Sequence, residues 1–442
     1  MGTGISFAEC LSFITMIEYN PISPGISWYE DTLEERPSYP FFDGEEQCDV
    51  VIIGGGFTGL SAAYHLANAG VRVVLCEASR FGDGASGRNG GQLGTGQRQW
   101  VETLEKKYGF ERSKALFDLA EEAKREILSW FAMPDCQCDF MEGQLSVIHK
   151  RREVVSYQRH VELMQRYGYH GLSFMDRDET AKRLGSSFYS GGLYDAQTGH
   201  INPLKLVVWL AKKAKNAGAK LYEKTQITAV NRKGRHWVVI TERGKIMAEH
   251  VLLATNAYKL GLERFVEKNI VSIRSYIGAT EPLSKDSPIL PGSESVDDSR
   301  FMVRYFRKSV DNRLLFGGVE SYDNRHPADL EERIRRQIAE IYPHLKSINL
   351  THRWGATVAI TVERMPYVRQ LLPGVIYCGG YSGHGVMLAP FMGKLYAEWL
   401  TGKCERFAYF QNLKISSFPG GRILRYPLVF LAMHWFSLMD HF

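Results

Sequence analysis

The apolar positions around residue 50 follow the pattern of a buried strand and then that of a helix. Residues 48–53 form a short β-branched run, residues 54–59 are rich in glycine, and residues 60–69 carry apolar side chains at helical spacing. Residues 71–76 predict a second strand, which ends at Glu77. The pattern therefore predicts one strand–helix–strand unit within about 30 residues.

The same order of strand, glycine-rich loop and helix recurs near the C-terminus. Residues 375–378 predict a short strand, residues 379–385 are glycine-rich, and residues 386–400 predict a helix that ends at Gly402. No internal repeat accounts for the recurrence. The two units therefore predict one cofactor domain assembled from separated stretches of chain.

Between these units the pattern alternates between helices and strands. Helices are predicted over residues 106–131, 151–167, 203–216 and 328–341. Strands are predicted over residues 143–148, 220–222, 225–231, 236–241, 250–254 and 313–318. This order predicts an α/β fold in which a discontinuous Rossmann-like domain is interleaved with a mixed-sheet α+β domain.

The domain boundaries follow from this order. The cofactor domain is expected over residues 48–100, 199–262 and 351–415, and the substrate domain over residues 101–198 and 263–350. Residues 1–47 form an N-terminal arm in this interpretation, and residues 416–442 form a C-terminal tail. The tail joins a basic cluster to an apolar, aromatic segment, a combination that can dock on a membrane surface, but we expect it to pack on the body of the protein.

Composition narrows the class of protein without changing this picture. The 442 residues are 44% hydrophobic and 23% charged, so the chain is globular and its core is large enough for a bulky cofactor. The net charge of +5 is spread along the chain, which argues against a nucleic-acid partner. No stretch is long and apolar enough for a transmembrane helix, and residues 7–17 lack the flanks of a signal peptide. We therefore expect a cytoplasmic protein, and its oligomeric state is not specified.

The cysteines predict neither a disulfide framework nor a metal site. Seven are few for this length, and most lie in apolar surroundings, so we expect reduced, buried thiols. Cys136 and Cys138 form a C-x-C pair, but no second pair or histidine cluster completes a zinc site. No metal is therefore expected.

The first glycine-rich loop has the spacing of a dinucleotide-binding turn. Gly54, Gly56 and Gly59 fit G-x-G-x-x-G between a strand and a helix, which permits a tight turn and a close approach of backbone N–H groups to a pyrophosphate. Glu77, at the end of the second strand, is placed to accept the hydroxyls of an adenosine ribose. This combination favours FAD or NAD over a 2′-phosphorylated cofactor.

The next loop favours a flavin. Residues 82–93 read G-D-G-A-S-G-R-N-G-G-Q-L, a run that offers many backbone amides along a diphosphate and a flavin ring. With this loop the sequence resembles the D-amino-acid-oxidase-like (DAO) family of FAD-dependent oxidoreductases over residues 28–442. Within the family it resembles the gamma-glutamylputrescine oxidoreductase branch, where S-G-R-N-G-G-Q-L occurs almost verbatim. Residues 379–385 match the G-[YF]-S-G-H-G loop of the family.

The resemblance implies which residues contact the cofactor, and it implies a discontinuous, Rossmann-like FAD-binding domain. The residues expected to contact FAD are Gly54, Gly56, Phe57, Thr58, Gly59, Glu77, Ala78, Ser86, Arg88, Asn89, Gly90, Gly91, Gln92, Val230, Ala254, Thr255, Gly380, Gly383, His384, Gly385 and Val386. Related sarcosine oxidases attach FAD through a cysteine aligned near residues 353–355, and none stands there, so we expect non-covalent FAD. Their oxygen-activating lysine is also replaced, by apolar residues near Leu315, which leaves oxygen or another molecule as the electron acceptor.

The resemblance also implies the reaction. Hydride would pass from the carbon beside a neutral amine to flavin N5, and the imine would hydrolyse to an aldehyde and ammonia, with hydrogen peroxide formed if oxygen is the acceptor. Gamma-glutamylputrescine or a related carboxylated amine is the favoured substrate. The alternatives are a secondary amino acid such as sarcosine or L-pipecolate, a dehydrogenase that passes electrons to a membrane quinone, and a flavin-binding redox partner without turnover.

The candidate residues outside the FAD loops fall into two groups. The candidates for a catalytic role are His384, Tyr381 and His200. The candidates for contact with the substrate are Arg274, Tyr276, Arg304, Tyr305 and Trp354. The two arginines are candidates because arginine is the usual partner of a substrate carboxylate. His200 lies in G-H-I-N-P, where resembling sequences often have G-H-I-H-P, so Asn202 departs from the family pattern.

Overall fold

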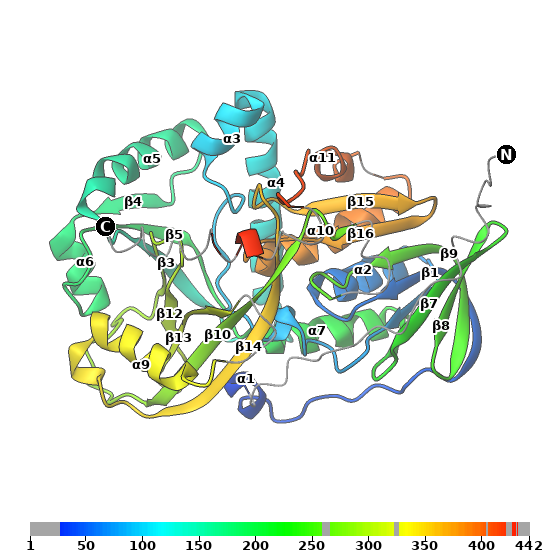
Figure 1. Ribbon diagram of the computed structural model, residues 1–442, viewed down its shortest axis with the longest axis horizontal. Helices are drawn as coiled ribbons and strands as arrows, with labels where there is room; N and C mark the ends of the chain where they lie inside the picture. Colours follow the sequence, from blue (N-terminus) through cyan, green and yellow to red (C-terminus); the bar gives the residue numbers. More distant parts are fainter. Residues whose placement is uncertain are drawn as a thin grey trace.

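Two mixed sheets organise the chain. The computed structural model describes residues 27–258, 266–321, 327–403, 405–420, 427–429 and 431. Within these residues the strands form two eight-stranded sheets, which we call sheet A and sheet B. Figure 1 shows them side by side, with sheet A on the right and sheet B on the left.

Sheet A has a parallel centre. Its strands are β1 (Gly44–Ile53), β2 (Val73–Cys76), β6 (Lys220–Tyr222), β7 (Ile227–Lys233), β8 (His236–Thr241), β9 (Gly244–Leu253), β15 (Tyr367–Leu372) and β16 (Val375–Gly379). Their order is β15-β16-β9-β1-β2-β6, and the β7–β8 hairpin joins at β9. β1 runs parallel to both β2 and β9, so strands from distant parts of the chain meet at the first glycine loop.

Helices cover sheet A and account for its continuous apolar runs. Val50, Val51 and Ile52 on β1 are fully buried, as expected for a parallel strand covered on both faces. α2 (Phe57–Asn68) packs on α10 (Gly385–Leu400) and on α7 (Pro203–Asn216). A Cβ at Gly393 of α10 would lie 2.4 Å from Thr58 O, so this glycine lets the helices cross closely.

Sheet B is mostly antiparallel. Its strands are β3 (Met141–Val147), β4 (Leu172–Met175), β5 (Gly192–His200), β10 (Val271–Pro282), β11 (Ser295–Asp298), β12 (Tyr305–Lys308), β13 (Arg313–Ser321) and β14 (Leu350–Ile360). Their order is β14-β10-β13-β12-β11-β3-β5-β4. The division of the chain into domains stays a prediction. The boundary expected at residue 351 falls at the start of β14, which pairs with β10 in sheet B although its residues were assigned to the cofactor domain.

The observed helix bounds agree with the predicted bounds where the capping residues are clear, and they differ where a glycine interrupts the helix. The remaining helices are α1 (Trp28–Asp31), α3 (Val101–Tyr108), α4 (Phe110–Phe131), α5 (Val154–Arg166), α6 (Arg177–Leu184), α9 (Leu330–Ile341) and α11 (Phe407–Gln411). The helix predicted over 106–131 is in fact α3 and α4, because Gly109 between them has φ +79°. α7 has the predicted bounds, with Asn202 as its N-cap and proline at its first position.

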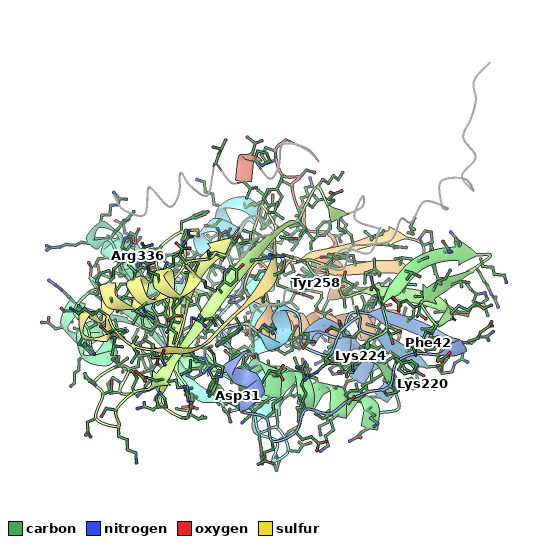
Figure 2. The ribbon with its side chains drawn as sticks, turned by 60° about the horizontal axis from the view of Figure 1, so that its bottom comes forward. Asp31, Phe42, Lys220, Lys224, Tyr258 and Arg336 are labelled. Carbon is green, nitrogen blue, oxygen red and sulfur yellow. The ribbon has the colours of Figure 1, made fainter. Side chains whose placement is uncertain are left out.

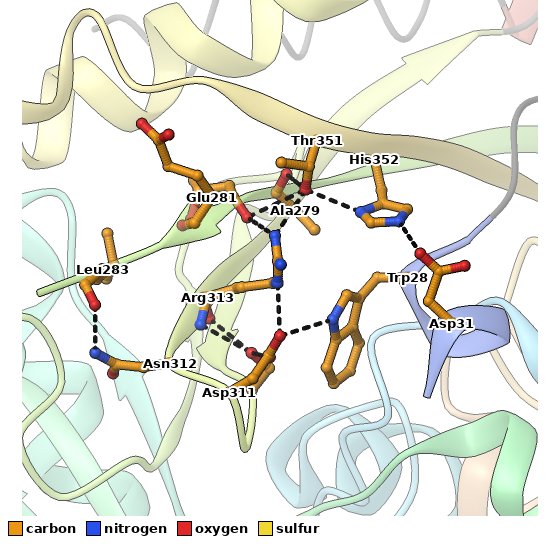
Figure 3. Close-up of polar contacts among 12 residues, drawn as sticks. Trp28, Asp31, Ala279, Glu281, Leu283, Asp311, Asn312, Arg313, Thr351 and His352 are labelled. Atoms are coloured by element: carbon orange, nitrogen blue, oxygen red, sulfur yellow. Dashed lines mark hydrogen bonds and ion pairs between the residues drawn. The ribbon is translucent and has the colours of Figure 1, made fainter. Parts of the chain in front are cut away.

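The N-terminal arm reaches both sheets. At one end Trp28 Nε1 donates to Asp311 Oδ2 at 3.3 Å, and Asp31 Oδ2 lies 2.8 Å from His352 Nε2 (Figure 3). At the other end the ring of Phe42 packs on Tyr222 of β6, and Figure 2 labels Asp31 and Phe42 along this path. The arm therefore links the edge of sheet B to the edge of sheet A.

Cysteines and the tail complete the description. Cys48, Cys76, Cys136, Cys138 and Cys378 are free and buried. The part of the chain that the structure describes contains no group of three or more His, Cys, Asp or Glu side chains that could hold a metal ion. Among them no helix has the length and apolar character needed to cross a membrane. Most of the predicted tail lies outside the described residues.

Candidate active site

The glycine loop after β1 forms a cradle at the carboxyl end of sheet A. Gly54 N donates to Cys76 O at 2.9 Å, which draws the loop against β2. A Cβ at Gly54 would lie 2.7 Å from Ala254 O, and one at Gly59 would lie 2.0 Å from Gly54 O. Only glycine fits at either position. A cavity of about 180 Å³, which we call the cradle, lies on this loop.

Glu77 faces the cradle from the end of β2. Its Oε2 accepts from Gly55 N at 2.7 Å and its Oε1 from Ser79 N at 2.9 Å. Burial raises the pKa of Glu77, and these two hydrogen bonds oppose the rise because they favour the carboxylate. Each oxygen keeps a lone pair, so the carboxylate is oriented to accept ribose hydroxyls.

Two helix N-termini also point at the cradle. α2 begins at Phe57, whose N–H donates to Ser86 Oγ at 2.9 Å, and α10 begins at Gly385. The positive end of each helix dipole favours a diphosphate or an electron-rich ring edge. A Cβ at Gly383 would meet nothing within 4 Å, which leaves open space before α10. The glycine loop, Glu77 and the two helix ends therefore fit FAD.

The structure brings most of the predicted FAD contacts together. Those lining the cradle are Gly54, Gly56, Phe57, Thr58, Glu77, Ala78, Ser86, Asn89, Ala254, Thr255, Gly383, Gly385 and Val386. Those lining only the larger cavity beside it are Arg88, Gly90, Gly91, Gln92 and His384. Gly59, Val230 and Gly380 line neither.

Val230 is one of the predicted FAD contacts that line neither cavity. It pairs with Val239 in the β7–β8 hairpin and belongs to the hydrophobic core of sheet A. The cradle is lined by Thr225, Gln226 and Ile227 from the start of the same stretch. The apolar pattern located this strand, but the family resemblance did not show which end of the strand lines the cradle.

The larger cavity adjoins the cradle and has a volume of about 880 Å³. Residues shared by the two linings are Ala85, Asn89, Val358, Ser382, Gly383 and Val386. Alternate residues of two neighbouring strands form one wall: Val271, Ile273 and Ser275 of β10, and Ala356, Val358 and Ile360 of β14. This cavity is the substrate chamber we consider below.

Of the predicted substrate contacts, Tyr305 alone lines the chamber. Its OH lies 3.1 Å from Ser275 Oγ. Arg274 and Tyr276 alternate with the lining residues of β10 and so belong to its opposite face, where Tyr276 packs in the core that includes α9. The prediction for these two residues ignored that alternation.

Arg304 and Trp354 are likewise absent from the chamber lining. Arg304 Nη2 donates to Glu340 Oε2 of α9 at 2.6 Å. Trp354 is fully buried and its Nε1 donates to Arg88 O at 3.0 Å. These contacts give both residues a role in packing the protein body.

The three catalytic candidates have different surroundings. His200 lines neither cavity, its Nε2 lies 2.8 Å from Ser293 O, and burial lowers its pKa to about 3. Tyr381 lines the cradle, and its OH lies 2.7 Å from Thr58 Oγ1. Burial raises the pKa of Tyr381 well above its usual range, so the phenol stays protonated.

His384 stands at the junction of the cradle and the chamber. Its Nε2 lies 3.1 Å from Gly96 O. Because a carbonyl only accepts, Nε2 carries the proton and Nδ1 is the unprotonated nitrogen. Burial, with a smaller effect of the Arg98 charge, lowers the pKa of His384 to about 4, so the ring is neutral at pH 7.

Charged side chains of both signs line the chamber, and sequence patterns singled out only one of them. They are Arg88, Arg98, Arg300, Arg364, Asp195, Asp297, Asp298 and Glu320. Arg300 forms an ion pair with Asp298. Asp297 accepts from Ser146 Oγ at 2.7 Å and from Gln144 Nε2 at 3.1 Å. No local motif marks these residues, because most of them come from different loops and strands of the chain.

Comparison with known proteins decides the family. The family model described as FAD dependent oxidoreductase (DAO) matches residues 49–399. The chain belongs to this family. It is 53% identical, over 96% of its length and 99% of the relative, to a probable oxidoreductase OrdL of Rhizobium meliloti (strain 1021). It is 35% identical, over 94% of its length and 98% of the relative, to the gamma-glutamylputrescine oxidoreductase of Escherichia coli (strain K12).

A solved structure shows the same fold. The glycine oxidase of Geobacillus kaustophilus superposes with a TM-score of 0.71 at 22% identity, covering 84% of this chain and 99% of that one. The predicted α/β fold, the FAD cofactor and the assignment as an oxidoreductase of the DAO family are therefore confirmed. The role of each site residue, the non-covalent attachment and the cytoplasmic location stay predictions.

Proposed function

We propose that this DAO-family protein oxidises a C–N bond of an amine that carries a distal carboxylate, with gamma-glutamylputrescine as the leading substrate. The observation that carries the proposal is the likeness, over nearly the whole of both chains, to a gamma-glutamylputrescine oxidoreductase. The chamber supports it, because charges of both signs beside the cradle suit a substrate with charged groups at separate points.

FAD, when bound, supplies the hydride acceptor. The chain positions it through the glycine loop, Glu77 and the N-terminus of α2. The N-terminus of α10 places its positive dipole end at the Gly383 loop, where it stabilises negative charge. The Thr58–Tyr381 hydroxyl pair holds that loop against α2.

The chamber residues orient the amine and limit its contact with water. Val271, Ile273 and Val358 form an apolar wall that excludes water from the reacting carbon. A neutral His384 offers Nδ1 as an acceptor, which suits a hydrogen bond from the amine. In this proposal no protein group forms a covalent bond with the substrate.

The test is anaerobic addition of gamma-glutamylputrescine to the FAD-loaded protein. We expect its visible flavin bands to bleach, with aldehyde and ammonia formed in equal amounts. Peroxide released in air would identify oxygen as the acceptor, and turnover with an artificial acceptor but none in air would identify a dehydrogenase. Bleaching by sarcosine or L-pipecolate, with none by gamma-glutamylputrescine, would replace the proposed substrate by a secondary amino acid.

A further inference from the structure

Arg98 is a cation at the wall of the chamber that forms no ion pair with any of the described residues. It follows the glycine-rich loop and lines the chamber. Among the described residues it has no hydrogen-bond or ion-pair partner, whereas Arg300 on the same chamber is paired with Asp298. Loss of hydration lowers the pKa of Arg98, and Asp297 and Glu320 oppose this. A guanidinium withdrawn from water in this way is stabilised when an anion binds it.

The backbone on the N-terminal side of Arg98 is held by a buried network. Lys124 Nζ donates to Thr95 Oγ1 at 2.7 Å, and Thr95 Oγ1 donates to Asp195 Oδ2 at 2.6 Å. Gly96 N donates to Glu121 Oε1 at 3.0 Å, and Glu121 forms an ion pair with Lys124. These bonds fix the loop, so the arginine is placed before any ligand arrives.

Gln97 and His384 complete the support of this loop. Gln97 Nε2 donates to Leu116 O at 2.7 Å, and His384 Nε2 donates to Gly96 O at 3.1 Å. The loop is thereby joined both to α4 and to the turn that begins α10. A fixed loop with an unpaired guanidinium is the arrangement expected of a binding group.

Asp297 supplies an opposite charge in the same chamber. It lies on β11, and Ser146 and Gln144 of β3 donate to its carboxylate. The charge of Arg98 is close enough to lower the pKa of Asp297, although burial still raises that pKa overall. The two side chains nevertheless form no ion pair with one another. A cation and an anion therefore line the same chamber without an ion pair between them.

We propose that Arg98 and Asp297 form a subsite for a zwitterionic α-amino-acid group of the substrate. The planar guanidinium binds the carboxylate through two parallel N–H···O bonds, and the carboxylate of Asp297 accepts from the ammonium. This inference rests on the proposed function and narrows its substrate class to amines whose far end is a free α-amino acid. When the zwitterion binds, its carboxylate lies beside Arg98 and its ammonium lies beside Asp297.

Calorimetric titration of the FAD-loaded protein with the γ-propylamide of L-glutamate tests the subsite. This ligand keeps the amino-acid end and lacks the terminal amine. We expect Arg98→Gln to weaken binding ten- to a hundredfold and Arg98→Lys to weaken it less, because lysine keeps the charge but not the planar fork. Arg112→Gln, on the exposed face of α4, is the matched control and should bind as the wild type does. Unchanged affinity in Arg98→Gln would overturn the proposal.

Two truncated ligands separate the two charges. The monopropylamide of glutaric acid has the carboxylate without the ammonium, and the propylamide of 4-aminobutanoic acid has the reverse. Arg98→Gln should weaken the first ligand and leave the second unchanged, and Asp297→Asn should do the opposite. Equal losses for both ligands in both variants would show damage to the chamber and reject the assignment. Should the variants not fold, wild-type protein that binds all three ligands equally rejects it as well.

The proposed function and the subsite fail in different ways. If gamma-glutamylputrescine bleaches the flavin but its KM is unchanged in Arg98→Gln, the function stands and the subsite falls. If it does not bleach the flavin while propylamide binding depends on Arg98 and Asp297, the function falls and the subsite stands. Bleaching by the propylamide itself would show that the α-amine is the group oxidised, which overturns the placement of that group at the far end.

Discussion

The cradle and the chamber adjoin one another but are built on different chemical principles. In the cradle, backbone N–H groups and helix ends face the ligand, and the glycines matter because they carry no side chain. In the chamber, recognition falls to side chains such as Arg98 and Asp297, which come from a loop and a strand of separate segments. Cofactor binding in the cradle therefore tolerates few added side-chain atoms, whereas substrate binding in the chamber is sensitive to changes in side-chain charge.

This difference divides the consequences of mutation. A substitution in the cradle acts on cofactor content, because the shape of the backbone determines whether the diphosphate can approach. A substitution in the chamber acts on substrate affinity and leaves the cofactor in place. Three changes, taken from the largest expected effect to the smallest, test the cradle and its border with the chamber.

Gly59→Ala should abolish FAD binding. Its Cβ would lie 2.0 Å from Gly54 O, so the backbone of the loop must move out of the shape that fits a pyrophosphate. Absorbance of the purified protein gives the flavin content. The control is Gly218→Ala, at a glycine with φ +100° where an added Cβ would meet nothing within 4 Å; this variant should keep its flavin and lose about 1 kcal/mol of stability. Full flavin content in Gly59→Ala would contradict the claim that the backbone shape of this loop determines FAD binding.

Glu77→Gln should weaken FAD binding about ten- to a hundredfold, in keeping with the loss of a charged hydrogen-bond acceptor. The amide has only one acceptor oxygen, and its NH₂ group would face the N–H of Gly55 or of Ser79. Fluorescence titration of the apoprotein with FAD measures the change. A matched Glu46→Gln variant, at the end of β1 away from the glycine loop and ion-paired with Lys220, should bind FAD normally. Equal affinity for all three proteins would remove Glu77 from the ribose site.

His384, at the border, should make stability depend on pH. The unfolded chain binds a proton on this ring below its ordinary pKa of 6.5, but the folded protein does so only near pH 4. Unfolding therefore takes up a proton between these values, so the free energy of unfolding falls as pH falls from 6.5 to 4, at up to about 1.4 kcal/mol per pH unit. Denaturant titrations should show a shallower fall in His384→Asn. Identical slopes in the two proteins would contradict the buried neutral ring.

The cradle could be predicted from sequence and the chamber could not, for physical reasons. The turn at Gly54, Gly56 and Gly59 is a local requirement of backbone geometry, so it leaves a short motif. Arg98 and Asp297 come to line one chamber only after β11 has paired with β3 and the loop has folded against α4, and no sequence spacing records such pairing. Arg274 does not line the chamber, and the sequence could not show this because residue type alone does not say which face of β10 a side chain takes.

The interleaving of the two sheets has a consequence for biosynthesis. β1 lies between β2 and β9, and the cradle is closed by Val386 and Ala389 near the far end of the chain. The first glycine loop therefore leaves the ribosome long before the segments that complete its pocket have been translated. FAD can be captured only after translation has passed Ala389, and a nonsense mutation before α10 yields a product that cannot retain it.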